Sequence, residues 1–196
     1  MDSFPLLTTE RLVLRNYSEA DVAAVHDIFS RAEVIEFYDC AAFTGIKQSA
    51  QLVSNTIARN AANGERGWRW GIALSSQPNE LIGSCSVHAI NRKFQSAELG
   101  YELHPAHWGK GLACEAASCV LHFCFSNEAP FSFNRIAATT DLDSVRSIAL
   151  LKRLGFLEEG VLRQYGYWKN EFHDVRMFSV LRQEWLIANS SRVQPK

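Results

Sequence analysis

The sequence lacks the strong charge that marks several large classes of protein. It carries 20 basic and 21 acidic side chains, so the formal net charge at pH 7 is −1. A chain this close to neutral has no broad field of one sign to attract a nucleic-acid backbone or an anionic membrane surface. We therefore expect neither nucleic acid nor membrane as a partner.

Long apolar stretches are missing as well. No segment runs apolar for the roughly 20 residues that a membrane-spanning helix needs. Residues 1–5 lack the basic and apolar regions of a signal peptide. Both absences favour a cytoplasmic location.

The sequence lacks a cysteine pattern that fits disulfides or a zinc site. The chain has five cysteines, an odd number, and none forms a C-x-x-C pair. Cys114, Cys119 and Cys124 lie on a predicted helix at a five-residue spacing, which points them in different directions instead of toward one metal ion. His104 and His107 form a His-x-x-His pair without a third ligand. We expect reduced thiols and no metal.

The features that are present indicate one globular domain. The chain has 196 residues, 47% of them hydrophobic and 21% charged, which is ordinary usage for a folded domain. We expect the domain to span residues 1–187 and a polar tail to span 188–196. Helical and strand patterns alternate, so the predicted class is α/β, or α+β on a stricter definition, with a mixed sheet covered by helices.

The predicted elements follow from periodicity and turn residues. Alternation indicates strands at 9–17, 68–74, 81–90, 97–103, 135–140, 161–168 and 172–181. Helical patterns follow Ser18 and cover 47–63, 113–126 and 144–154. Turns are expected at 77–80 and 169–170, and Gly155 is expected to end the helix before it.

The most informative segment is a strand, a glycine turn and a helix start in succession. Glycines let a backbone approach a ligand closely, and the first amides of a helix, reinforced by its dipole, bind phosphate groups. Lys110 adds a positive charge beside the turn. The alternative is a tight turn with a helix cap and no ligand. The turn reads Trp108-Gly109-Lys110-Gly111-Leu112-Ala113.

Two better-known phosphate motifs do not fit this segment. A P-loop needs Gly-x-x-x-x-Gly-Lys followed by Ser or Thr, whereas these glycines are closer and the hydroxyl is absent. A Rossmann fingerprint opens an early βαβ unit, whereas this turn follows half of the chain.

Jointly, several segments resemble the GNAT superfamily of acetyl-CoA-dependent N-acetyltransferases, and within it the RimJ/RimL-like branch. The resemblance implies a mostly antiparallel sheet with helices on both faces and a splayed central strand pair where acetyl-CoA wedges. The segments that carry it are Leu7 to Arg15, Leu81-Ile82-Gly83, Ala97 to Tyr101, Trp108 to Ala116, Ser147, Leu154-Gly155-Phe156, Gly160 to Arg163 and His173-Asp174-Val175.

The resemblance also implies residues that hold the cofactor. The amides from Trp108 to Ala113 would bind its pyrophosphate, and Leu103, at a strand end, would bond its pantetheine arm. Ser144 and Ser147 would complete the cofactor contacts. The sequence departs from the family at Ala106, where Gln or Arg is usual, and at Ser144, where this branch usually carries Asn.

Acyl transfer to an amine needs an acid for the departing thiolate and a base for the amine. The matching serine of the branch lies near the acetyl-CoA sulfur, which makes Ser147 the expected acid; the alternative is that it caps its own helix. Glu98 and Glu102 lie four apart on one strand and share a face, so either carboxylate is a candidate base, with Glu98 favoured by the resemblance. Their alternative is a solvated face or pairing with arginine.

These observations predict an acyltransferase that moves acetyl from acetyl-CoA to a primary amine, by direct attack in a ternary complex. The N-terminal α-amine of a protein or peptide is the favoured acceptor. A polyamine, an amino acid or an aminoglycoside is the alternative, and so is a non-catalytic sensor that binds CoA. Formation of a homodimer is left open.

Overall fold

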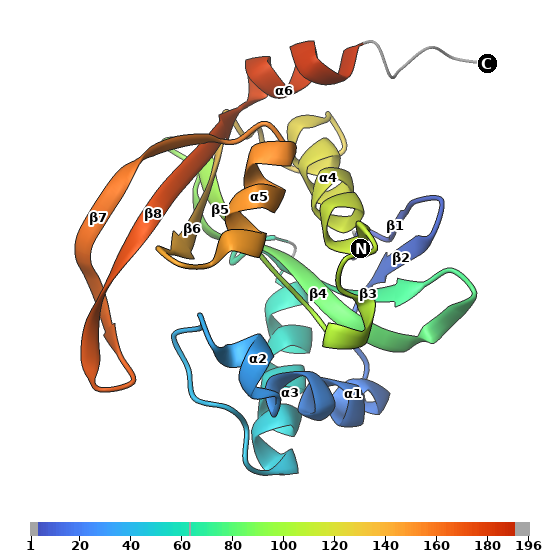
Figure 1. Ribbon diagram of the computed structural model, residues 1–196. Coiled ribbons are helices and arrows are strands. Elements are labelled where there is room, and N and C mark those ends of the chain that lie inside the picture. Colours follow the sequence, from blue (N-terminus) through green and yellow to red (C-terminus); the bar gives the residue numbers. More distant parts are fainter. Residues whose placement is uncertain (1–3, 63, 191–196) are drawn as a thin grey trace.

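The computed structural model describes residues 4–62 and 64–190. Within these residues, eight strands form one sheet in the order β1-β2-β3-β4-β5-β6-β8-β7 (Figure 1). The strands are β1 Leu7–Thr8, β2 Leu12–Arg15, β3 Trp68–Leu74, β4 Gln77–Asn91, β5 Ser96–Leu103, β6 Arg135–Asp141, β7 Leu157–Trp168 and β8 Glu171–Leu181.

The sheet opens between β5 and β6, which are its one parallel pair among the described strands. Three residue pairs join them, and the last is Glu98 with Ala137. Beyond this point β5 continues to Leu103 and β6 to Asp141 without further pairing. All other neighbouring strands are antiparallel. The predicted splayed pair is therefore confirmed.

Helices cover both faces of the sheet, as predicted. On one face α4 packs centrally with α5 and α6, and on the other lie α1, α2 and α3 with the short 3-10 helix η1 (Figure 1). Their bounds are η1 Glu19–Asp21, α1 Val22–Phe29, α2 Ala32–Ile35, α3 Ile46–Asn60, η2 Pro105–His107, α4 Leu112–Phe125, α5 Val145–Arg153 and α6 Arg182–Asn189.

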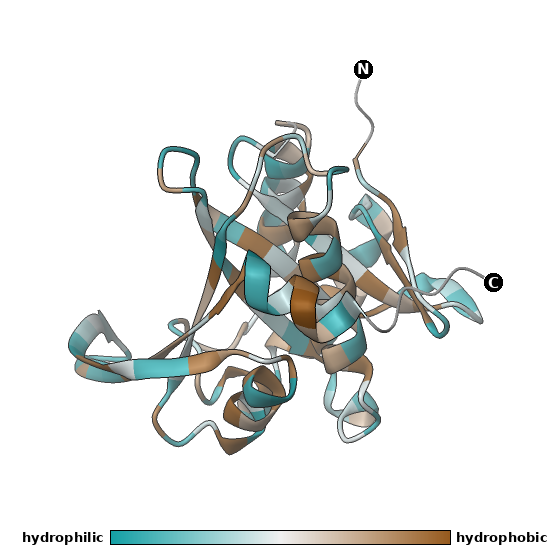
Figure 2. Ribbon diagram, turned by 90° about the horizontal axis from the view of Figure 1, so that it is seen from above, coloured by the Kyte–Doolittle hydropathy of each residue, from teal (hydrophilic) through white to brown (hydrophobic). Residues whose placement is uncertain are grey.

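Strand alternation divides the core between the two faces. Trp68, Trp70 and Ile72 of β3 are buried in the cluster that contains α4. A second cluster packs α1 and α3 against the opposite face. In Figure 2 the hydrophobic colours gather on the strands and helices at the centre, and the projecting loops are largely hydrophilic. Residues of one strand therefore reach two different environments.

Several predicted boundaries need correction. The strand expected at 9–17 is a hairpin, in which Leu7 of β1 pairs with Leu14 of β2. The turn expected at 77–80 lies at Ser75 and Ser76, and residues 78–80 form a bulge within β4 because Ala73 pairs with Leu81. Helix α3 ends at Asn60, short of the expected end, which lies outside the described residues.

Two helices were not expected from the sequence. Helix α2 has four residues, and α6 continues through Ala188 and Asn189, so the expected tail boundary falls inside a helix. Residues 191–196 of that tail lie outside the described residues. The closing hairpin is as predicted: Lys169 and Asn170 both have positive φ, which suits a two-residue turn.

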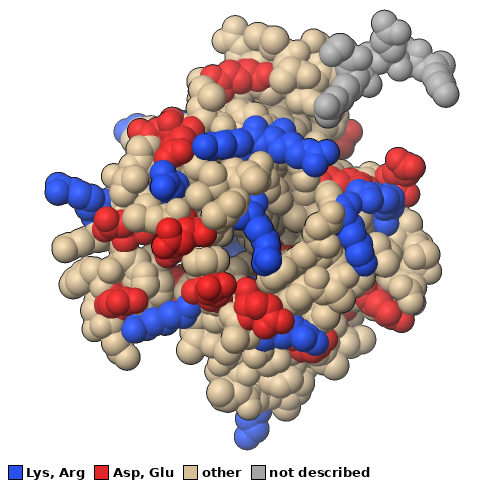
Figure 3. Space-filling model, viewed as in Figure 1, with Lys and Arg blue, Asp and Glu red and all other residues tan. Residues whose placement is uncertain are grey.

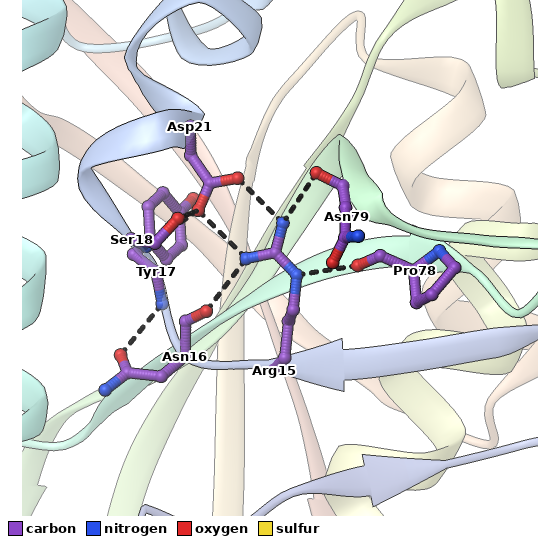
Figure 4. Close-up of polar contacts among 7 residues, drawn as sticks. All are labelled: Arg15, Asn16, Tyr17, Ser18, Asp21, Pro78 and Asn79. Atoms are coloured by element: carbon purple, nitrogen blue, oxygen red, sulfur yellow. Dashed lines mark hydrogen bonds and ion pairs between the residues drawn. The ribbon is translucent and has the colours of Figure 1, made fainter.

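Arg15 holds the N-terminal strands, η1 and the β4 bulge together (Figure 4). Its guanidinium forms a two-bond ion pair with Asp21, at 2.7 and 2.9 Å. The same group donates to the carbonyls of Pro78 and Asn79 at 2.8 and 3.3 Å. Hydrogen bonds therefore compensate the carbonyls that the bulge removes from the β3–β4 ladder.

Candidate active site

The glycine turn and the start of α4 form a cradle of backbone amides. Gly109 and Gly111 have φ of +72° and +76°, a conformation that glycine adopts without strain. Gly111 is the N-cap residue of α4. Within the described part of the chain, no hydrogen bond uses the amides of Gly109 to Ala113 as donors. Five amide donors are therefore available beside the positive end of a 14-residue helix.

Cationic side chains border this cradle. Lys110 is exposed and donates from Nζ to the carbonyl of Ala106 at 2.8 Å. Arg11 donates to the carbonyl of Lys110 at 3.1 Å and pairs with Glu115 of α4 at 2.5 Å. Glu115 also accepts from Thr9, so the cradle is braced against the first strands. Sequence motifs alone give no signal for this contact, because Arg11 and Glu115 are far apart in the chain.

A groove of about 900 Å³ begins at the cradle and follows the outer side of α4. Its walls come from the cradle, from the end of α5 and from α6, including Arg153 and Trp185. An anionic ligand bound at the amides has room to extend along this groove. The groove therefore belongs to the cradle side of the site.

Ser147 meets a tyrosine across the opening in the sheet. Its Oγ lies 2.7 Å from the hydroxyl of Tyr101, which comes from β5, whereas Ser147 comes from α5. Burial raises the pKa of Tyr101, so this hydroxyl stays protonated at neutral pH. The Ser147 side chain is thus engaged with Tyr101 in this arrangement. Ser144 is the N-cap residue of α5 and makes no side-chain capping bond.

The end of β5 is tied to the cradle through Trp108. The indole Nε1 of Trp108 donates to the carbonyl of Leu103 at 2.7 Å. The guanidinium of Arg146, the residue before Ser147, lies 4.6 Å from the centre of a Trp108 ring. Leu103, the cradle and the first turn of α5 are therefore held in one arrangement.

Glu98 and Glu102 share a strip of polar residues on the sheet face opposite α4. Three cross-strand pairs of β4 and β5 make up this polar strip: Ser84 with Glu102, Ser86 with Gly100, and His88 with Glu98. The intervening residues Val87 and Leu99 belong to the α4 cluster, which places the strip on the other face. The predicted shared face of the two carboxylates is borne out.

The two carboxylates differ in what surrounds them. Glu102 is buried, and Arg69 donates to its Oε1 at 2.6 Å while Ser84 bonds the same oxygen. Tyr38 donates to its Oε2 at 2.9 Å. Pairing with arginine, the alternative to a catalytic role, is thus observed for Glu102. Glu98 lies at the accessible end of the strip, 3.9 Å from Nε2 of His88.

The remaining titratable candidates are hydrogen-bonded to neighbouring residues or buried in the core. His104 accepts from the amide of Ala106 at 3.2 Å and lies 3.1 Å from Asp27. Burial raises the pKa of Cys85 and Cys124, so neither is a thiolate at neutral pH. The described residues contain no group of three or more His, Cys, Asp or Glu side chains that could hold a metal ion. No described helix is long and apolar enough to cross a membrane.

Sequence reasoning missed four residues of this site. Tyr101, Arg69 and Arg146 contact predicted residues through the tertiary fold, which spacing along the chain does not reveal. His88 had a usable signal, because it stands on a predicted strand next to the strand of Glu98. Its pairing with Glu98 required only the hairpin register.

A mixed sheet that opens beside a cradle of unpartnered amides suits an acyltransferase that uses a CoA thioester. The profile of the acetyltransferase (GNAT) domain family matches residues 11–157. The chain belongs to this family, and it is an N-acetyltransferase whose cosubstrate is acetyl-CoA.

Similar proteins cover nearly the whole chain. The uncharacterized N-acetyltransferase YoaA of Bacillus subtilis (strain 168) is 36% identical over 91% of this chain and 98% of its own. The ribosomal-protein-serine acetyltransferase of Escherichia coli (strain K12) is 27% identical over 67% of this chain and 72% of its own. The spermidine N(1)-acetyltransferase of Vibrio cholerae is 23% identical over 90% of this chain and 96% of its own.

A solved structure shares the fold. RimL, a ribosomal L7/L12 α-N-protein acetyltransferase in complex with coenzyme A, aligns with a TM-score of 0.77 at 22% identity. The alignment covers 90% of this chain and 98% of that chain. The relatives support placing the chain in the RimJ/RimL-like branch.

The residues present fit acetyl-CoA. Unpartnered amides, two glycines with positive φ and the charge of Lys110 suit a pyrophosphate. The opening between β5 and β6 lies beside this cradle, and the buried hydroxyl of Thr140 on β6 has no partner among the described residues. By strand alternation this side chain lies on the α4 face of β6 with Ile136 and Ala138, so a polar ligand atom on that face would satisfy the hydroxyl.

Proposed function

We propose that this enzyme acetylates the N-terminal α-amine of a protein or peptide, by direct attack in a ternary complex. One observation carries the proposal. The opening in the sheet has the Ser147–Tyr101 hydroxyl pair on one side and the carboxylate of Glu98 on the other face. An acid and an amine-binding group are therefore available on opposite sides of one strand.

Each predicted residue has a proposed role in this reaction. Acetyl-CoA supplies an activated thioester. Ser147, held by Tyr101, provides the proton for the departing thiolate, and Glu98 attracts the ammonium form of the acceptor. Glu102 instead braces the strip through Arg69. The proposed cofactor contacts are Leu103, Trp108, Gly109, Lys110, Gly111, Leu112, Ala113, Ser144 and Ser147.

The state of the cysteines supports direct attack. A covalent acetyl-enzyme would need an activated thiolate. Burial raises the pKa of Cys40, Cys85, Cys119 and Cys124, which disfavours that form. Transfer from acetyl-CoA to the amine in one step needs no such group.

The charge of the polar strip supports an acceptor with one ammonium group. Arg69 neutralises Glu102, so within the strip Glu98 is left to meet a single cation. A polyamine carries several cations and would be expected to need more carboxylates. Figure 3 shows acidic and basic side chains interspersed over the viewed face, without a broad acidic field.

Thiol release from acetyl-CoA tests the proposal. We expect release with peptides that begin with Ala, Ser or Met, and slower release with spermidine, amino acids or aminoglycosides. If a small amine were the preferred acceptor, the proposal of a protein or peptide acceptor would be wrong. Tight acetyl-CoA binding without turnover of any amine would favour a sensor.

The Ser147→Ala variant tests the acid. We expect it to retain acetyl-CoA binding, which depends mainly on the amide cradle, and to lose about 10²-fold in kcat, because acid catalysis contributes on this order. Ser54→Ala is the matched control, since Ser54 is exposed on α3, away from the opening. Equal kcat in Ser147→Ala and the control would remove Ser147 from the mechanism.

A further inference from the structure

His88 and Glu98 form a polar pair at the accessible end of the strip. They face each other across the β4–β5 ladder, and their side chains are 41% and 32% exposed. The two residues before the accessible end, Ser86 and Gly100, also face each other. The strip thus runs from the buried Glu102 cluster to a carboxylate and an imidazole that a ligand can reach.

The two side chains lie close enough for one polar atom beside them to contact both. Nε2 of His88 and Oε2 of Glu98 are 3.9 Å apart, which is too long for a direct hydrogen bond. Gly100 keeps the neighbouring position clear, because a Cβ there would lie 3.1 Å from Ser86 Oγ and 3.4 Å from His88 Cε1. A nitrogen that donates to both groups would complete the arrangement.

The pair also lies at the position where the sheet opens. Glu98 makes the last β5 pairing to β6, with Ala137, before the two strands separate. Tyr101 and Ser147 meet three residues further along β5, on the opposite face. The pair is therefore next to the opening yet separated from the hydroxyl pair by the strand itself.

We propose that the acceptor ammonium contacts both Glu98 and His88, and that His88 Nε2 takes its proton. The inference rests on the proposed function, since it requires an amine acceptor. An N–H bond of the ammonium breaks, its electron pair stays on the amine, and an N–H bond forms on Nε2. The imidazolium that results lies beside the Glu98 carboxylate, which stabilises it. The neutral amine then attacks the acetyl carbonyl.

The surroundings keep His88 ready to accept a proton at neutral pH. Burial lowers its pKa below the usual value, Arg59 of α3 and Arg69 of β3 lower it further, and Glu98 and Asp39 oppose this shift. The imidazole is therefore mainly neutral at pH 7. A neutral imidazole can accept a proton, and such contacts often shorten when substrate binds.

The first test compares His88→Gln with wild type in the peptide assay across pH. Wild-type kcat/KM should fall as pH drops through the pKa of His88, because imidazolium cannot accept a proton. His88→Gln should lose about 10²-fold in kcat at pH 7, and its kcat/KM should not show this fall at low pH. Glu98→Gln should mainly raise KM for the peptide. His26→Gln, on α1 and bonded to Ser49, is the matched control and should match wild type.

A titration without substrate separates this proposal from the proposed function. The His88 ring is followed by NMR in wild type and in Glu98→Gln, where loss of the carboxylate should lower the pKa of His88. Unchanged titration would show that the two groups do not interact, and would overturn the pair even if no amine were acetylated. The proposal would also be overturned if His88→Gln kept the wild-type kcat and the wild-type fall of kcat/KM at low pH.

Discussion

At the scale of single residues, the Arg15–Asp21 pair illustrates how one side chain secures several elements. Asp21 is 2% exposed and Arg15 18% exposed, so the pair is largely shielded from water. Removing one partner leaves a buried charge uncompensated, which typically costs about 3–5 kcal/mol. The same guanidinium also bonds the carbonyls of the β4 bulge. Its loss therefore affects η1 and β4 together.

We predict that Arg15→Met lowers the free energy of unfolding by about 3 kcal/mol at pH 7, measured by urea denaturation. Arg31→Met is the control, because its helical pair with Asp27 is exposed and contributes roughly 0.3–0.5 kcal/mol. Equal losses in the two variants would contradict the argument.

The pH dependence of this effect follows from Asp21. Burial opposes its ionisation, but hydrogen bonds from Arg15 and Ser18 outweigh burial and lower the pKa of Asp21. The pair's stabilisation is therefore complete above the unfolded value of about 3.9 and is lost as pH falls through the lower folded pKa. The difference between wild type and Arg15→Met should shrink below about pH 4.

Residue spacing predicted which face the carboxylates share, but not which of them pairs with an arginine. Glu98 and Glu102 occupy equivalent places in the alternation of β5, yet only Glu102 has Arg69 beside it. Arg69 comes from β3, and its approach is decided by the order of strands in the sheet. A role that depends on a partner from another element is invisible to spacing alone.

At the scale of elements, the start of α4 depends on glycine geometry. Gly111 has φ +76°, and a Cβ there would meet no atom nearer than Arg11 Nη2, at 3.7 Å. A side chain would therefore fit in space but would strain the backbone by roughly 1–2 kcal/mol. Relief of that strain would turn the amides away from their common direction.

We predict that Gly111→Ala raises the Kd for acetyl-CoA about 10-fold, because a misdirected cradle loses about 1.4 kcal/mol of binding. Calorimetry measures this change. Gly160→Ala is the control: its φ of +147° is also unfavourable for alanine and its Cβ would meet nothing within 4 Å, but it lies on β7. The control should lose stability and keep its Kd. A raised Kd in both variants would indicate a general loss of structure.

Elements with strong periodicity were predictable, and short or atypical ones were not. Strand β3 has the predicted bounds because Trp68, Trp70 and Ile72 alternate with residues of the other face. The segment 77–80 has turn composition, yet residues 78–80 bulge within β4, where Arg15 binds the carbonyls of Pro78 and Asn79. Helix α2 has too few residues to show a helical period. Only Trp185 of α6 is buried, so its pattern is weak.

At the scale of the whole molecule, the opening divides the sheet into two blocks. Strands β1 to β5 form one, and β6, β8 and β7 form the other. Three residue pairs at one end of β5 and β6 join the blocks, together with the helices packed over them. A cofactor arm inserted in the opening would bond to both strand edges. Acetyl-CoA would then act as a structural connection as well as a reactant.

This connection predicts more than the stabilisation that any ligand gives. At 100 times its Kd, a ligand that binds only the folded state adds about 2.7 kcal/mol. For a chain of this size that raises Tm by roughly 5–11 °C. A fragment that keeps the cofactor's nucleotide and phosphates but lacks the pantetheine arm, 3′-phosphoadenosine 5′-diphosphate, should give a similar rise in Tm at equal saturation, because linkage depends on occupancy alone. The two ligands should differ only in how strongly they protect the backbone amides that line the opening.

Hydrogen exchange at equal saturation separates the two effects. We predict that amides of residues 99–103 and 138–141 exchange more slowly with acetyl-CoA than with the fragment, since these segments line the unpaired edges of β5 and β6. Amides of β3, which pairs on both sides, should be protected equally by both ligands. Equal protection of the opening by both ligands would mean that the arm makes no contact there. The two blocks would then be joined by their three shared pairs and the overlying helices alone.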